Sequence, residues 1–262
     1  MRLTLIVTTY ERPDALARVL QSVGEQSQAP DEIIVADDGS GKPTRELIQT
    51  FARQAPAPVQ HVRQDHDGFR LARLRNLALA AANGDYLIFI DGDMVLHREF
   101  LLDHRRAAEP GHYCQGLRIP LTPSATQAVL QGGQPPRWRD PGIEGRRRLY
   151  ALRLPQWQPV LRLPARWLLA IKGCNQGFWR RDLLAVNGYD ESFIGWGSED
   201  KDLCERVERA GIRRQGLLAG ALAYHLYHPP ADRSHADDNR ERLQKARQSG
   251  RLRAEHGVDQ HL

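Results

Sequence analysis

Cysteine is scarce in this sequence of 262 residues, and the three that occur, Cys114, Cys174 and Cys204, are scattered along it. An odd, scattered set without metal-ligand spacing argues against a disulfide framework and suits a reducing compartment. No apolar run approaches the ~20 residues of a membrane-spanning helix. The first residues also turn polar too soon for a signal peptide. We therefore expect a cytoplasmic protein in which the cysteines are small buried side chains.

The sequence also lacks a glycine-rich, basic phosphate loop after its first apolar strand, where it reads Thr8-Thr9-Tyr10-Glu11. A nucleotidyltransferase that makes nucleotide sugars would ordinarily carry such a loop, although it would share other features of this chain. We keep that enzyme class as an alternative function for this chain. The composition, 41% hydrophobic and 26% charged, is that of a globular protein, and the length suits one large core.

Positive charge is unevenly distributed, because the net charge of +5 arises mainly from one segment. Residues 137–166 hold eight arginines against two carboxylates, with tryptophans interleaved. An anionic membrane surface is one partner that such a segment would suit, so we expect peripheral membrane contact through residues 137–167. A mobile acceptor loop, a partner interface and a packed surface insertion are alternatives. No nucleic-acid-binding motif accompanies the arginines, and nucleic acid is not an expected partner.

Apolar strands alternate with helical patterns through the first hundred residues. Strands are predicted at 3–7, 33–36, 59–62 and 86–90, and helices from Pro13, around 47–51 and over 71–82. This alternation predicts an α/β fold with a central, mostly parallel sheet flanked by helices.

Two of these strands end in paired carboxylates, Asp37 with Asp38 and Asp91 with Asp93. Gly92 separates the second pair and lets the chain turn without a side chain in the way. The carboxyl ends of parallel strands share one edge of a sheet, where α/β proteins bind ligands. Two close carboxylates repel unless a cation lies between them, and Mn²⁺ or Mg²⁺ shared with a diphosphate would meet that need. Ordinary turn chemistry is the alternative.

Arg70, Arg73 and Asn76 lie three residues apart and therefore share one face of the predicted helix over 71–82. Near a helix start that faces the sheet edge, they would bind diphosphate oxygens or the base. A solvated basic face is the alternative reading.

Several motifs, taken in order, resemble family 2 glycosyltransferases of the GT-A fold. In the first half they are Thr8-Thr9-Tyr10-Glu11-Arg12-Pro13, Asp37-Asp38-Gly39-Ser40, Ala72-Arg73-Leu74-Arg75-Asn76 and Asp91-Gly92-Asp93. In the second half, Lys172-Gly173-Cys174-Asn175, Gly188-Tyr189-Asp190-Glu191 and Gly195-Trp196-Gly197-Ser198-Glu199-Asp200 are similar to chondroitin-polymerase and β-1,4-galactosyltransferase-type enzymes. The resemblance implies a single domain over residues 1–229. Its parts would be a nucleotide-sugar half (1–108), an arginine-rich insertion (109–169) and an acceptor half (170–229), followed by a charged helix or frayed tail (230–262).

The resemblance also implies roles for individual residues. Asp200 would be the catalytic base, with Glu199 as its supporting or acceptor-binding carboxylate. The metal ligands would be Asp93, Asp91 and His225, with His228 as the competing candidate for the histidine. Acceptor contacts would come from Trp196, Gly197 and Asn175. The nucleotide sugar would be bound by Thr9, Tyr10, Glu11, Asp37, Asp38, Arg70, Arg73, Asn76, Asp91 and Gly92.

Glu199 and Asp200 also have a plain structural reading, because acidic residues in the first turn of a helix stabilise its dipole by ~0.3–1 kcal/mol. Two considerations favour a role for these carboxylates in catalysis. Trp196 between glycines offers a flat face for a sugar ring, and glycosyl transfer needs a base for the acceptor proton. We therefore expect an inverting, metal-dependent glycosyltransferase that uses a nucleotide sugar, a UDP-sugar by preference. The acceptor would be a hydroxyl of a growing glycan or a lipid-linked saccharide. A non-enzymatic binding module that acts through the arginine-rich segment is the second rival.

Overall fold

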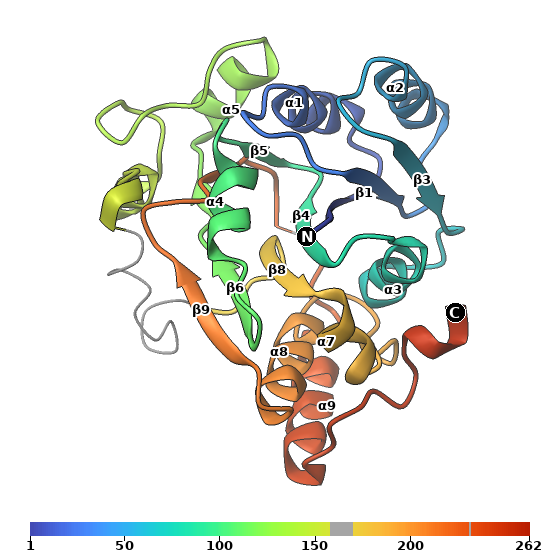
Figure 1. Ribbon diagram of the computed structural model, residues 1–262. Helices are drawn as coiled ribbons and strands as arrows, with labels where there is room; N and C mark the ends of the chain where they lie inside the picture. Colours follow the sequence, from blue (N-terminus) through green and yellow to red (C-terminus); the bar gives the residue numbers. More distant parts are fainter. Residues whose placement is uncertain (158–169, 231) are drawn as a thin grey trace.

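The computed structural model describes residues 1–157, 170–230 and 232–262 (Figure 1). The strands are β1 (Leu3–Thr9), β2 (Glu32–Asp37), β3 (Val59–Arg63), β4 (Tyr86–Asp91), β5 (Met94–Leu96), β6 (His112–Gly116), β7 (Ile119–Pro120), β8 (Asn175–Trp179), β9 (Arg213–Leu217) and β10 (Ala223–His225). The α-helices are α1 (Pro13–Gly24), α2 (Lys42–Ala52), α3 (Leu71–Ala81), α4 (Phe100–Ala107), α5 (Pro123–Leu130), α7 (Arg180–Ala185), α8 (Glu199–Arg209) and α9 (Ala236–Ser249). Short 3-10 helices span Gly145–Ala151, Pro155–Trp157 and Val258–His261.

A central sheet in the order β3-β2-β1-β4-β8-β6-β9 organises the fold. β8 is antiparallel to both of its neighbours, and the remaining strands run in one direction. The mostly parallel α/β sheet predicted from the sequence is confirmed. A small second sheet has the strand order β5-β10-β7, and its strand β5 follows β4 directly in the chain.

The central strands bury both of their faces, which is why they read as continuous apolar runs. In β1, Leu5 and Val7 enter one core cluster while Ile6 enters a second cluster on the opposite face. Helices α1 and α2 cover the first face, and α3, α7 and α8 contribute to the second. Alternation along the strands thus separates two cores, one on each side of the sheet.

Strand register brings the expected carboxylates to one edge. Thr9 of β1 pairs with Asp37 at the end of β2, and Thr8 pairs with Asp91 at the end of β4. The two pairs of acidic residues therefore follow neighbouring strand ends on either side of β1. The three cysteines are buried and free, as predicted.

Two parts of the chain contribute strands to the central sheet that the sequence did not predict. The segment expected as a surface insertion, 109–169, begins with β6, which lies inside the central sheet between β8 and β9. β8 itself was not predicted, because its sequence Asn175-Gln176-Gly177-Phe178-Trp179 is rich in amides. Gln176 is nonetheless fully buried, since its amide donates to Gln115 and to Cys204.

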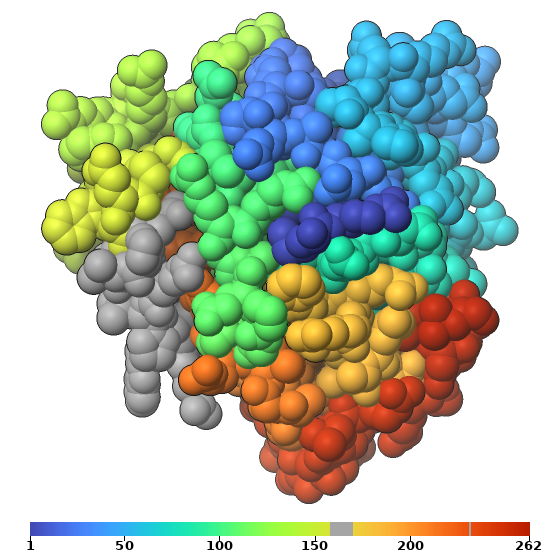
Figure 2. Space-filling view, in the orientation of Figure 1, coloured from blue at the N-terminus to red at the C-terminus, as the bar shows by residue number. Residues whose placement is uncertain are grey.

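The C-terminal segment is a helix followed by a packed tail. The helix is α9, and the residues after it pack against the rest of the chain. Val258 is 1% exposed in the second core cluster, and its N–H donates to the carbonyl of Asn187. Asn187 in turn donates to the carbonyl of Ala254. Figure 2 shows this red segment lying against the yellow part of the chain, where α7 follows β8.

No helix in the described ranges is both long enough and apolar enough to cross a membrane.

Candidate active site

The turn after β4 is shaped by its contact with β1. The N–H of Gly92 donates to the carbonyl of Thr8 at 2.6 Å, and a Cβ at position 92 would lie 2.8 Å from the same oxygen. Glycine is therefore required here by the neighbouring strand, and not only by an approaching ligand as the sequence suggested. On either side of Gly92, the carboxylates of Asp91 and Asp93 contact different partners.

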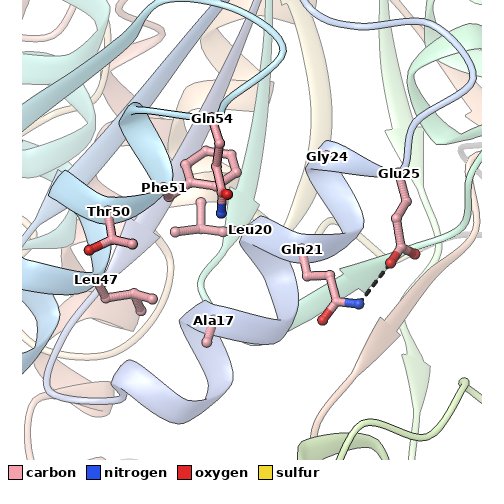
Figure 3. Close-up of a pocket in the computed structure, with 9 residues that line it drawn as sticks. All are labelled: Ala17, Leu20, Gln21, Gly24, Glu25, Leu47, Thr50, Phe51 and Gln54. Carbon is pink, nitrogen blue, oxygen red and sulfur yellow. Dashed lines mark hydrogen bonds between the residues drawn. The ribbon is translucent and has the colours of Figure 1, made fainter.

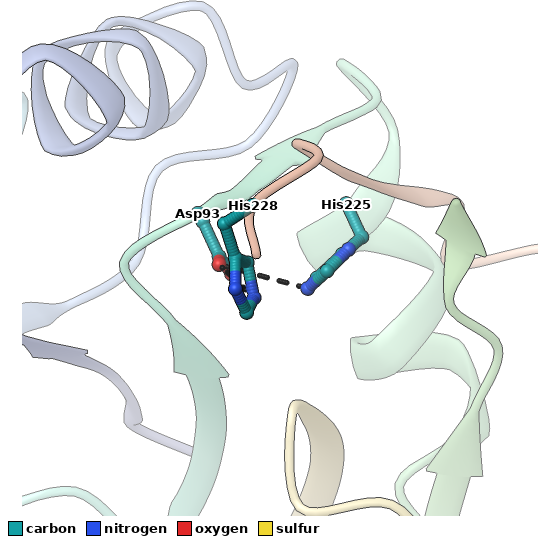
Figure 4. A group of neighbouring side chains, drawn as sticks. All are labelled: Asp93, His225 and His228. Atoms are coloured by element: carbon teal, nitrogen blue, oxygen red, sulfur yellow. Dashed lines mark ion pairs between the residues drawn. The ribbon is translucent and has the colours of Figure 1, made fainter. Parts of the chain in front are cut away.

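Asp93 meets two histidines from the strand and loop that follow α8 and β9. Its Oδ2 lies 3.3 Å from Nε2 of His228 and 3.6 Å from Nε2 of His225 (Figure 4). One ligand atom from each of these residues lies within 4.8 Å of the other two. The sequence offered His225 and His228 as competitors for one position, whereas the structure brings both to the same carboxylate. Asp91 does not belong to this group, because its carboxylate faces Arg75 and Thr8.

The Asp93 group fits a divalent cation. The second carboxylate oxygen of Asp93, Oδ1, is buried and has no hydrogen-bond partner among the residues that the structure describes, although a buried acceptor ordinarily has a donor. Burial, and then the charge of Arg118, lower the pKa of His225 to about 3, which leaves its imidazole neutral as metal binding requires. One carboxylate with two imidazoles suits Mn²⁺ or a similar transition metal better than Mg²⁺, which prefers oxygen ligands throughout.

Several basic side chains surround the same point. Nη1 of Arg12 lies 3.2 Å from Oδ2 of Asp93. Burial and then the charge of Asp91 raise the pKa of Asp93 to about 6, and Arg12 and Arg118 oppose that rise. The pKa of the half-buried Lys172 is lowered by burial and then by the charge of Arg118. The region thus combines three side chains that could hold a metal ion with nearby positive charge, an arrangement that suits a diphosphate.

The expected base-binding side is organised around Asp38. Its carboxylate accepts hydrogen bonds from Nε2 of Gln64 at 2.5 Å and contacts Nδ1 of His66 at 3.0 Å. The ring of His66 is stacked on Tyr10, with centroids 4.3 Å apart and planes 13° from parallel. Arg73 donates to Oε1 of Gln64 at 2.9 Å. Tyr10 is 43% exposed, and it therefore offers a flat aromatic surface beside buried polar groups.

Asp37 and Glu11 hold the neighbouring turns together. Asp37 is fully buried, and its carboxylate accepts from the N–H of Ser40 and lies 3.0 Å from Nε2 of His61. Burial would raise the pKa of Asp37, but the hydrogen bonds from His61 and Ser40 outweigh it, and the pKa is lowered. Glu11 accepts from the N–H of Gly41 at 2.7 Å, which ties the turn after β1 to the turn after β2. Thr9, at the end of β1, is also buried.

The second pair of carboxylates begins α8. Oδ2 of Asp200 accepts from the N–H of Gly173 at 2.9 Å. Oε1 of Glu199 lies 3.3 Å from Nη1 of Arg75, whose Nη2 lies 3.1 Å from Oδ1 of Asp91. The guanidinium of Arg75 is 1% exposed, and it joins the acidic turn after β4 to the start of α8.

Burial and mutual repulsion set the protonation of this carboxylate pair. Burial, followed by the charge of Asp200, raises the pKa of Glu199 to about 7. Burial also raises the pKa of Asp200, against the opposing effects of Arg75 and of the hydrogen bond from Gly173. A carboxylate with a raised pKa is a stronger base than a free one, which suits proton abstraction near neutral pH.

The loop before α8 presents Trp196 to solvent, with 42% of the residue exposed. Gly195 and Gly197 have φ values of 78° and 102°, a region that favours glycine. Ser198 also has a positive φ, 78°, at the N-terminal end of α8. The backbone therefore turns tightly on both sides of the indole ring.

Three predicted contact residues are directed elsewhere. Asn76 and Asn175 are fully buried, so neither is placed to touch a ligand in this structure. Asn76 donates to the carbonyl of Tyr189, and Asn175 donates to the carbonyls of Leu117 and Ala221. Arg70 forms an ion pair with Asp67 near the surface. Arg70, Arg73 and Asn76 therefore do not form one ligand-facing side of α3, because Asn76 lies in the core and Arg70 lies near the surface.

Sequence reasoning missed Arg75, Arg12, His61, Gln64 and His66. Arg75 stood inside a quoted motif, but nothing in the spacing distinguished it from Arg73, because burial is decided by packing with α8. Pro13 drew attention to the helix start and not to the arginine before it. His61 lies within β3, whereas Gln64 and His66 follow it. A search for polar residues after every predicted strand would have found Gln64 and His66.

The expected membrane-contact segment is described only up to residue 157. Within it, Leu149, Tyr150 and Trp157 are 61%, 39% and 57% exposed. Residues 158–169 lie outside the described ranges.

A separate shallow pocket lies between α1 and α2 (Figure 3). Leu20, Leu47 and Phe51 form part of its wall, and Gln21 donates to Glu25 at its edge. It shares no residue with the site at the strand ends.

Two family models match the sequence. Residues 4–147, more than half of the chain, match "Glycosyl transferase family 2", and residues 164–229 match "N-terminal domain of galactosyltransferase". Among curated proteins, the chondroitin synthase of Escherichia coli is 28% identical over 90% of this chain and 36% of its own length. The validoxylamine A glucosyltransferase of Streptomyces hygroscopicus subsp. limoneus is 27% identical over 80% of this chain and 48% of its own length. The chain therefore spans half or less of the length of these two relatives.

Solved structures confirm the predicted GT-A fold. Staphylococcus aureus TarS 1–349, in complex with UDP-GlcNAc, has a TM-score of 0.68 at 18% identity and covers 100% of this chain and 69% of its own. The mannosyltransferase PcManGT from Pyrobaculum calidifontis, in complex with GDP-Man and Mn²⁺, has a TM-score of 0.60 at 19% identity. It covers 93% of this chain and 61% of its own.

Proposed function

The chain belongs to glycosyl transferase family 2, and on that premise we propose that it is an inverting, metal-dependent glycosyltransferase. The donor is a nucleotide sugar, a UDP-sugar by preference. The acceptor is a hydroxyl of a growing glycan or of a lipid-linked saccharide.

The bridge through Arg75 carries this proposal. A single buried guanidinium binds Asp91, in the turn that holds the donor-side carboxylates, and Glu199, beside the candidate base. A purely structural turn after β4 would not need a buried arginine that reaches the start of α8. The bridge instead keeps two acidic centres at a fixed separation, which a transfer between donor and acceptor requires.

Asp93, His225 and His228 would hold Mn²⁺ or Mg²⁺, with Mn²⁺ preferred because two of the three ligands are imidazoles. When bound, the ion would offset the negative charge of the departing nucleotide diphosphate as a Lewis acid. Arg12 would bind the same diphosphate from the protein side. The Mn²⁺ in the complex of PcManGT supports this assignment.

Asp200 would take the proton from the acceptor hydroxyl. The acceptor oxygen then forms its bond to the anomeric carbon from one face while the bond to the diphosphate oxygen breaks on the opposite face. Oδ2 of Asp200 is oriented by the N–H of Gly173, and the raised pKa of the carboxyl makes Asp200 a stronger base than an ordinary aspartate. Glu199 would support the base and the acceptor. Trp196 and Gly197 would border the acceptor.

The nucleotide would bind along the ends of β1, β2 and β3. Tyr10, stacked on His66, offers a surface for the base, and Asp38 offers a carboxylate for a base N–H. The UDP and UDP-GlcNAc complexes of TarS support uridine as the nucleoside. Exposed Leu149, Tyr150 and Trp157, beside the arginines at 146–148, support peripheral contact with an anionic membrane on the cytoplasmic side.

Thermal unfolding with UDP, in the presence and absence of Mn²⁺, tests donor binding directly. A ligand at a hundredfold excess over its dissociation constant stabilises the fold by ~2.7 kcal/mol. UDP release from UDP-GlcNAc and UDP-glucose then tests chemistry. We expect Asp200→Asn to abolish sugar transfer while UDP still binds, and the exposed Asp237→Asn to behave as the unaltered chain. Loss of UDP binding with transfer retained in Asp200→Asn would contradict the roles.

A further inference from the structure

Three exposed apolar side chains gather beside the start of α8. Phe69, Ile194 and Trp196 are 39%, 42% and 42% exposed. The N–H of Gly195 donates to the carbonyl of Phe69 at 2.8 Å, which fastens the loop that carries Ile194 and Trp196 to the turn before α3. Large apolar side chains that are exposed as a group, and not singly, indicate a surface that binds something.

An arginine from the segment before α9 covers part of this surface. The guanidinium carbon of Arg233 lies 4.7 Å from the centroid of the Trp196 ring. Within the described ranges, no carboxylate lies within ion-pair distance of that guanidinium. Stacking uses the flat face of a guanidinium and leaves its N–H edge free to bind a carboxylate or a phosphate.

α9 fixes the loop from behind. Asn239 is 1% exposed, and its Nδ2 donates to the carbonyl of Ile194 at 2.9 Å and to that of Trp196 at 3.4 Å. A Cβ at Gly195 would lie 2.7 Å from the Cβ of His235, so this loop and the N-terminal end of α9 are in direct contact. Arg233 and Asn239 both lie beyond residue 229, where the second family match ends.

We propose that Phe69, Trp196 and Arg233 form a subsite for an anionic saccharide acceptor, one that carries a carboxylate or a phosphate next to the sugar that receives the transfer. The sugar ring lies against the aromatic side chains, and its acidic group binds the free edge of Arg233. Asn239 is a positioning residue for this subsite. The inference rests on the proposed glycosyl transfer and names the class of its acceptor.

Binding measurements with the full chain test the inference, with Mn²⁺ and UDP present. The probes are hyaluronan oligosaccharides, the same oligosaccharides with reduced carboxyl groups, and the reduced oligosaccharides phosphorylated on the new hydroxyl groups. We expect the carboxylated probe, the phosphorylated probe or both to bind about tenfold more tightly than the carboxyl-reduced probe, as one charge-assisted contact allows. The two charged probes separate a carboxylate from a phosphate as the recognised group.

Two variants divide the contributions. Arg233→Gln should remove the tenfold preference for anionic probes and leave binding of the neutral probe unchanged. Asn239→Leu should weaken the charged and neutral probes alike, because it releases the loop that carries Trp196. Arg240→Gln is the matched control for Arg233→Gln, since Arg240 is a nearby exposed arginine in α9 that pairs with Asp237.

Equal binding of the charged and carboxyl-reduced probes would overturn the inference, as would an unchanged preference in Arg233→Gln. Failure of every anionic probe to bind would overturn it too. UDP binding is measured on the same samples. If UDP binds and the anionic probes do not, only the acceptor class is wrong, whereas absence of UDP binding would reject the proposed function itself.

Discussion

Nη1 of Arg75 lies 3.3 Å from Oε1 of Glu199, although the two residues are 124 positions apart in the sequence. The same guanidinium binds Asp91 at 3.1 Å and lies 5.3 Å from the ring centroid of Tyr189. A buried arginine with two carboxylate partners neutralises charge that would otherwise repel. The acidic turn after β4 and the acidic start of α8 therefore depend on one side chain.

Replacement of this arginine should damage activity and stability together. Arg75→Met leaves Asp91 and Glu199 without their cation, and breaking a buried pair costs about 3–5 kcal/mol of folding free energy. We expect a lower midpoint of thermal unfolding and no measurable sugar transfer by the fraction that remains folded. Arg206→Met is the matched control, because Arg206 is fully buried and pairs with Asp202. It should lower stability and leave the rate per folded molecule near its original value. Full transfer by folded Arg75→Met would contradict the role of the bridge.

The metal group should behave as a unit of three ligands. Asp93→Asn, His225→Ala and His228→Ala should each weaken Mn²⁺ binding by at least about tenfold, since even the loss of a group that only hydrogen-bonds to a metal ligand costs that much. Titration calorimetry with Mn²⁺ measures the affinity, and chelation of the metal should abolish transfer by the unaltered chain. His256→Ala changes an exposed histidine outside the group and should bind Mn²⁺ normally. Unchanged affinity in both histidine variants would show that the ion binds elsewhere.

The pH profile of transfer should report the acidic pair at the start of α8. Burial raises the pKa of Asp200 and, with the charge of Asp200, raises the pKa of Glu199 to about 7. A base must be deprotonated to act, so activity should be lost as the pH falls through these raised pKa values, at a higher pH than for an ordinary carboxyl. Glu199→Gln removes one negative charge and should move the acidic limb to lower pH. A limb that stays near pH 4 in the unaltered chain would contradict a buried base.

Gly173 should not tolerate a methyl group. Its N–H binds Asp200, and a Cβ at this position would lie 2.6 Å from Nη1 of Arg75. Gly173→Ala forces the guanidinium away from its carboxylates, and such overpacking costs about 1–3 kcal/mol. We expect a clear fall in transfer rate, measured beside Gly24→Ala, where a Cβ meets nothing within 4 Å. Equal rates in the two variants would show that the position of Arg75 is unimportant.

Local patterns predicted the parallel part of the fold and the edge at which the site lies. The apolar run of β4 and the continuous burial of β1 follow from a sheet that is covered on both faces. The same rules could not predict β8, because its amides bond to distant parts of the chain: Gln176 donates to Gln115, and Asn175 donates to the carbonyl of Ala221. The packed tail depends on contacts with Asn187, which no local pattern reveals.

The site shows the same division. The sequence predicted that Asp37, Asp38, Asp91 and Asp93 lie at one edge of the sheet, because each is at or just after the end of a strand. The arginines could not be sorted in this way. Arg75 and Arg73 are two residues apart on α3, and only the approach of α8 makes one of them buried and the other half-exposed. The two histidines near Asp93 were both visible in the sequence, but only the turn after β10 brings them together.

A crystal of the chain with Mn²⁺ and UDP tests the central claim most directly, through the anomalous signal of manganese. The account predicts one manganese peak bonded to Asp93, His225, His228 and the diphosphate, with the carboxylate of Asp200 facing the open side of the donor. A manganese peak away from these ligands, or UDP bound on a surface that Asp200 cannot reach, would contradict it.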